Sequence, residues 1–133
     1  DVSDNSLLKS LMCERNQLEL LDLQAATLIQ DLSCSENQLT SLDVANCNSL
    51  GSLECSANRL TSLNTSNNTE LWLLYCGNNQ ITSLDLSNNT LIYQLAIDHM
   101  PSLTSVCVWV MPFPVTAYTT GSPNFFYTTD CSK

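Results

Sequence analysis

The sequence predicts a repeat solenoid: a right-handed coil with a parallel β-sheet on its concave face, an extended or irregular convex side and a C-terminal cap. Two observations predict it. Cysteine recurs every 21 residues, and columns of leucine or isoleucine recur with the same period. Each period is one coil, so we expect about five coils in residues 1–108 and a capping segment in residues 109–133. The cysteine column comprises Cys13, Cys34, Cys55 and Cys76.

Each cysteine marks the strand of its coil, because the motif around it, L-x-x-L-x-C-x-x-N-x-L, matches the leucine-rich-repeat pattern. Alternate strand side chains point to opposite faces, so Leu11 and Cys13 face inward while Met12 faces outward. One coil cannot bury its apolar edge alone, whereas stacking at about 4.8 Å per coil closes a continuous core. An asparagine follows each cysteine, and we expect these side chains to satisfy backbone groups where the chain leaves the strand. They are Asn16, Asn37, Asn58 and Asn79.

The cysteine column is expected to be a ladder of buried free thiols. In-register side chains on parallel strands point the same way, which fits disulfide geometry poorly. Zinc needs four converging ligands, whereas the ladder spreads four thiols over about 14 Å. Free cysteine in a core behaves as a small apolar residue. We therefore expect no metal and no cofactor.

Two further cysteines, Cys107 and Cys131, lie off the ladder, in the last coil and its cap. A disulfide closing this roughly 25-residue loop would stabilise the cap by about 3 kcal/mol. Such a bond implies an extracytoplasmic location. On the convex side, Cys47 is expected to be a neutral replacement for Asn or Ser, and the column Asp22, Asp43 and Asp85 to cap turns rather than to bind calcium.

Composition and charge exclude several functions. The chain has 4 Lys+Arg against 13 Asp+Glu, a formal charge of −9, which repels phosphate backbones and argues against a nucleic-acid partner. No stretch approaches the roughly 20 apolar residues of a membrane span. The single histidine, His99, follows Asp98, but adjacent strand residues point to opposite faces, so we expect no catalytic dyad and no enzyme.

An aromatic patch is expected on the concave face, the surface that solenoids commonly use for binding. The outward positions of the first three coils are polar and mostly small, whereas the next two coils add large rings. Tyr and Trp dominate interface hot spots and could also stack on sugar rings. The candidate ligand-binding residues are Trp72, Leu73, Tyr75, Tyr93, Gln94, Asp98 and His99.

Two alternatives remain open for this patch. The cap could fold back and cover it with Phe125, Phe126 and Tyr127, or the rings could be exposed without a function. The opposite end of the solenoid differs: the sequence begins in mid-coil, so we expect a fragment of a longer protein. The uncapped first coil would leave strand edges that allow end-to-end dimers.

The period, the inward cysteine and the phrase L-T-S-L-D-x-S-x-N-T resemble the bacterial cysteine-ladder leucine-rich repeats, which include certain internalins and Bacteroidetes-type surface proteins. The segment 101–108, with a second cysteine near the end, is similar to the last repeat and cap of the Bacteroidetes-type proteins. The resemblance implies a secreted or cell-surface protein that recognises a protein or a glycan. The helical N-terminal cap of internalins is not seen. A structural spacer with no ligand of its own is the alternative function.

Overall fold

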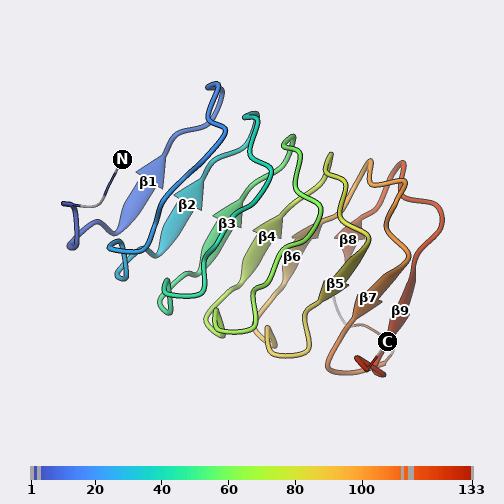
Figure 1. The fold of residues 1–133 in the computed structure, drawn as a ribbon. Helices are drawn as coiled ribbons and strands as arrows, with labels where there is room; N and C mark the ends of the chain where they lie inside the picture. Colours follow the sequence, from blue (N-terminus) through green and yellow to red (C-terminus); the bar gives the residue numbers. More distant parts are fainter. Residues whose placement is uncertain (1, 3, 112, 114–115, 133) are drawn as a thin grey trace.

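The chain folds as a parallel solenoid (Figure 1), which confirms the predicted fold class. This computed structural model describes residues 2, 4–111, 113 and 116–132. None of these residues is helical, and no helix that could span a membrane is found among them. Side chains from both sides of the coil meet in one continuous core.

The main sheet carries the predicted strands of the repeat. Its strands pair in parallel, and neighbouring coils keep the period of the sequence, so that Leu11 lies beside Leu32, Leu53 beside Leu74, and Leu74 beside Leu95. The sheet has six strands, in the order β1 (Ser10–Met12), β2 (Asp31–Ser33), β3 (Ser52–Glu54), β4 (Leu73–Tyr75), β6 (Gln94–Ala96) and β8 (Ala117–Tyr118).

A second, three-stranded sheet forms on the opposite side of the coil (Figure 1). The sequence predicts an extended or irregular convex side, and three short strands of its later coils pair there. Ser83 pairs with Ser105, which lies 22 residues further on, so the coil between them contains one residue more than the 21-residue period. The strands are β5 (Ser83–Asp85), β7 (Ser105–Cys107) and β9 (Phe126–Thr128).

The cysteine column points into the core. Cys34, Cys55 and Cys76 have no exposed surface, whereas Cys13, in the first coil, is partly exposed. Burial raises the pKa of Cys34 to about 12, and burial together with the Asp98 carboxylate raises the pKa of Cys76 to about 12. The thiols therefore stay protonated and pack as small apolar groups.

The asparagine column joins successive coils. Asn58 donates from Nδ2 to the carbonyls of Cys34 and Cys55, both at 3.1 Å, and its Oδ1 accepts from the Leu39 amide at 3.0 Å. One side chain thus satisfies buried backbone groups of two neighbouring coils. Asn37 and Asn79 repeat the pattern, while the exposed Asn16 bonds within its own coil only.

A second asparagine ladder, which the sequence did not reveal, lies on the other side of the coil. Asn68 donates to the carbonyls of Val44 and Cys47, and Asn89 donates to those of Thr65 and Asn68. The Thr65 hydroxyl donates to Asn89 Oδ1 at 2.9 Å, whereas the equivalent partner of Asn68 is Val44, which has no hydroxyl. Asn68 Oδ1 is accordingly buried without a hydrogen bond in the described structure.

A residue with a left-handed backbone conformation follows each strand of the repeat. It lies two positions after the ladder cysteine, or after Ile97 in the coil that lacks the cysteine. The φ angles of this column lie between 51° and 57°. At the matching convex turns, the expected capping carboxylates accept hydrogen bonds from amides two residues on, as Asp43 does from Ala45 at 2.9 Å. The left-handed column comprises Arg15, Glu36, Ala57, Asn78 and His99.

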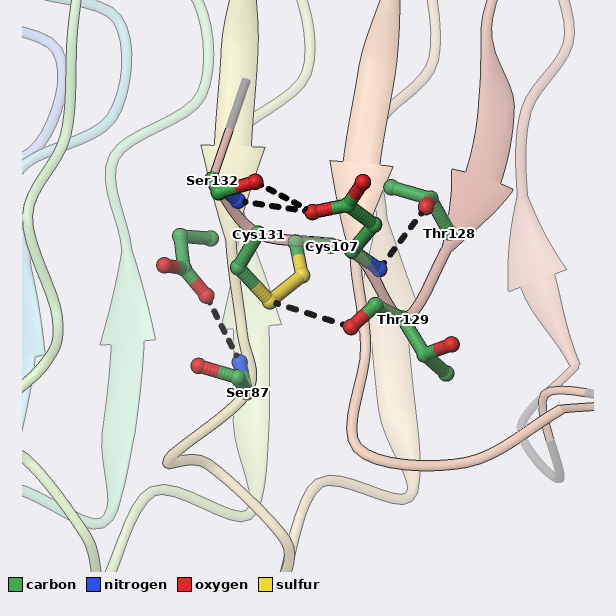
Figure 2. The surroundings of a disulfide bond; sticks show 8 residues. Ser87, Cys107, Thr128, Thr129, Cys131 and Ser132 are labelled. Atoms are coloured by element: carbon green, nitrogen blue, oxygen red, sulfur yellow. Dashed lines mark hydrogen bonds between the residues drawn. A yellow bond between two sulfur atoms is a disulfide. The ribbon is translucent and has the colours of Figure 1, made fainter.

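The C-terminal segment extends both sheets instead of lying across the last coil. It contributes β8 to the main sheet and β9 to the second sheet, so the solenoid has one turn more than the leucine pattern predicts. The turn lacks that pattern because aromatic rings fill its interior, with Phe113 4.9 Å from Tyr127 and Phe125 5.2 Å from Tyr127 between ring centroids. A disulfide joins Cys107 of β7 to Cys131, close to Ser87 and Thr129 (Figure 2).

Candidate ligand-binding site

Two aromatic rings stack on the outer face of the main sheet. Trp72 precedes β4 and Tyr93 precedes β6, and the Tyr93 amide donates to the Trp72 carbonyl at 3.1 Å. Parallel pairing therefore places the two side chains side by side, with ring centroids 5.5 Å apart and planes 14° from parallel. Tyr93 is 61% exposed, so the C-terminal segment does not cover it.

A glycine seats the tryptophan on the sheet. A Cβ at Gly51 would lie 2.8 Å from Nε1 and 3.1 Å from Cδ1 of Trp72, closer than packing allows. The indole edge consequently lies against the backbone of the preceding coil. The chain has 3 glycines. Gly77 likewise lies against Asp98 of the next coil, whereas Gly121 has a left-handed φ of 76° and lies against His99 of the preceding coil. Glycine within a leucine-rich repeat was the signal that sequence reasoning overlooked.

An open cleft lies beside the indole, at the ends where the strands of the second to fourth coils begin. Polar side chains from three successive coils form it together with one face of the aromatic patch. Asp31 and Glu70 contribute carboxylates to the cleft. Three further residues contribute neutral polar groups. The lining residues are Gln30, Asp31, Asn48, Ser49, Gly51, Glu70 and Trp72.

The middle of the candidate patch is less accessible. The Tyr75 hydroxyl donates to Gln94 Oε1 at 3.2 Å, which ties β4 to β6 at their outer face. Leu73, which the sequence placed among the ligand-binding residues, is 8% exposed and offers little surface. Tyr93 is the exposed ring of the patch, and Trp72 beside it is half-buried.

The prediction that Asp98 and His99 point to opposite faces is wrong. His99 Nδ1 lies 2.8 Å from Asp98 Oδ2, and Asn78 Nδ2 donates to the same oxygen at 3.4 Å. The alternation rule fails because His99 has a φ of 51° and has already left the strand. This polar group lies where the strands end, whereas Trp72 and Tyr93 lie where they begin, so the structure divides the predicted residues into two groups.

One set of potential metal ligands comes together in the described part of the chain. Donor atoms of Asp85, Cys107 and Cys131 lie within 4.8 Å of one another. The two sulfurs are bonded to each other in the disulfide, and thiolate is the form of cysteine that binds a metal. The oxidised chain therefore offers one carboxylate there, which is a weak site by itself.

Comparison with known proteins supports the fold but gives no match by sequence. No protein-family model and no curated protein matches the sequence. The parallel solenoid with inward cysteines has the fold of the cysteine-ladder leucine-rich repeats. Among solved structures, the chain is similar to the functional domain of InlJ from Listeria monocytogenes, which includes a cysteine ladder. The TM-score is 0.78 at 25% identity, and the match covers 94% of this chain and 32% of the InlJ chain, so this chain spans about a third of the length of that solved domain.

Proposed function

We propose that the chain is a non-catalytic recognition module of a secreted or cell-surface bacterial protein, and that it binds a protein or a glycan through the outer face of its main sheet. The stack of the half-buried Trp72 on the exposed Tyr93 carries this proposal. Large rings with polar tips supply much of the binding energy at interfaces. Gly51 holds the indole in place before any ligand arrives, which reduces the ordering cost of binding.

Two other features support the proposal. The structural likeness to an internalin domain, together with the Cys107–Cys131 disulfide, suits an extracytoplasmic protein. The 21-residue coils of residues 1–108 would supply most of the main sheet, and residues 109–133 would extend it by β8 at one end. The alternative, a structural spacer without a ligand, predicts that no compound or protein binds the sheet face.

The test is binding to a panel of oligosaccharides and surface proteins by wild type, Trp72→Ala and Tyr93→Ala. Losing one hot-spot ring should weaken binding about 10-fold or more. Phe126→Ala is the matched control, because Phe126 is an equally exposed ring, 62% accessible, on the second sheet. Equal affinity of all four proteins would remove this site, and the absence of any ligand would favour the spacer.

A further inference from the structure

We propose that the cleft beside Trp72 binds a cationic side chain, an arginine or a lysine, of a basic polypeptide. This inference rests on the proposed recognition function and names the chemistry of its ligand. The cleft combines an aromatic ring with two carboxylates, and this is the combination that attracts a guanidinium or ammonium group.

The two carboxylate residues come from different coils and line the same cleft. Asp31 begins β2, and Glu70 lies in the turn that leads to β4, two residues before Trp72. The lining of the cleft includes no lysine or arginine that could neutralise them. A cationic group entering the cleft would therefore gain charge-assisted hydrogen bonds without displacing a cation of the protein.

The indole of Trp72 is part of the lining of the cleft. Its edge lies against Gly51 and its ring is stacked with Tyr93, so these two contacts hold Trp72 in its place in the lining of the cleft. An indole face attracts a cation through the negative potential of its π-system, and tryptophan is the strongest of the aromatic residues in this respect.

The net negative charge of the whole chain also favours a cationic ligand. The formal charge is −9 with only 4 Lys+Arg, and one of these cations, Arg15, already pairs with Glu36 at 3.0 Å on the outer face. An acidic surface raises the local concentration of cationic partners and speeds their association. A neutral glycan gains nothing from this field, so the charges favour a basic polypeptide over a neutral sugar.

The experiment measures binding of an acetylated, amidated dodecapeptide of alternating glycine and arginine by calorimetry in low and moderate salt. The same peptide with citrulline in place of arginine keeps the shape and removes the charge. A neutral hexasaccharide is the third probe. Wild type is compared with Trp72→Ala, Trp72→Phe and the double variant Asp31→Asn/Glu70→Gln.

A second double variant, Glu19→Gln/Asp43→Asn, removes two charges outside the cleft and is the matched control. The amide introduced at position 43 should still cap its turn, because Asn64 caps the equivalent turn at 3.0 Å. We expect the arginine peptide to bind wild type, with a loss of about 10-fold or more for citrulline, for Trp72→Ala and for Asp31→Asn/Glu70→Gln. Trp72→Phe should recover part of the affinity, and the control variant should lose less than about 3-fold. Thermal unfolding of each variant establishes that it is folded.

Four results would overturn the inference. Equal losses of affinity in the two double variants would show that the peptide responds to the overall charge and not to the cleft. Equal affinity for the citrulline and arginine peptides would show that the positive charge does not contribute to binding. A hexasaccharide whose binding depends on Trp72 but not on Asp31 and Glu70 would retain the recognition function and replace the ligand class. The absence of binding by any probe, together with the absence of any ligand on the wider panel, would instead remove the recognition function itself.

Discussion

The side-chain amide of Asn58 donates to the carbonyl of Cys34, one coil earlier, and to the carbonyl of Cys55 in its own coil. The inward cysteine and the asparagine that follows it therefore act together. The thiol fills the core at the end of the strand, and the amide satisfies the backbone that the same strand end leaves unpaired. Each coil is held to its neighbour by both.

Replacing Asn58 with alanine should destabilise the chain by about 2 kcal/mol, because it leaves the buried Leu39 amide without a partner and removes one of the two donors of the Cys34 and Cys55 carbonyls. Asn16→Ala is the control, since Asn16 is exposed and bonds only to Cys13 and Glu14 of its own coil. Urea unfolding of both variants measures the difference. Similar free energies of unfolding for the two would contradict the ladder's role.

Val44→Thr should stabilise the chain by about 1 kcal/mol. The new hydroxyl would reach Asn68 Oδ1, which has no partner in the described structure, as the Thr65 hydroxyl reaches Asn89 Oδ1. The reciprocal change, Thr65→Val, should cost about as much or more. The comparison uses urea unfolding midpoints, and a loss of stability in both variants would show that the two positions are not equivalent.

The chain should lose stability as the pH rises from about 9 towards 12. Burial raises the pKa of Cys34 and of Cys76 from 9.0 to about 12, so the native state keeps protons that the unfolded state has lost. Each thiol accounts for about 2 kcal/mol at about pH 10.5. Urea unfolding at about pH 8 and about pH 10.5 should show a smaller pH effect in Cys34→Ala/Cys76→Ala than in wild type. An identical pH effect in the two proteins would be inconsistent with buried thiols.

Cys131→Ser should destabilise the chain by about 3 kcal/mol, because it opens the loop that the disulfide closes. A reducing agent provides the internal control. It should lower the unfolding midpoint of wild type to that of the variant and leave the variant itself unchanged. An effect of reduction on the variant would point to another bond.

Gly51→Ala should displace the Trp72 indole while the coil remains folded, because the new Cβ meets the movable end of a side chain. Ligand binding should fall about as far as it does in Trp72→Ala. Tryptophan fluorescence in a Trp109→Phe background would report the displacement, with Ser52→Ala, the neighbouring change, as the control. Unchanged emission and affinity in Gly51→Ala would show that the glycine does not seat the ring.

The sequence was sufficient for the fold because the period fixes the register. Once cysteine and leucine recur every 21 residues, Leu53 must lie beside Leu74, and the parallel sheet follows. The second asparagine ladder was missed because only Asn68 and Asn89 belong to it, and an earlier coil has Cys47 at that position.

The site was harder to predict, because it depends on directions that a repeat does not encode. The pairing of Asp98 with His99 required a left-handed residue at the end of the strand. The contact between Gly51 and Trp72 could be predicted only if the direction of the indole, toward the preceding coil, were known. Both depend on a side chain of one coil meeting a particular residue of the next, and the columns specify only the shared scaffold.

The amide ladders reach from each coil to the adjacent one and no further. Removing residues 35–55 would accordingly bring Cys34 into the place of Cys55 and let Asn58 continue the row, with the surrounding partners still in phase. Unequal recombination between gene copies can thus add or remove whole coils while the contacts between adjacent coils are preserved. The number of coils can then vary under selection. The surface side chains of individual coils, such as the one that bears Trp72, can diverge independently.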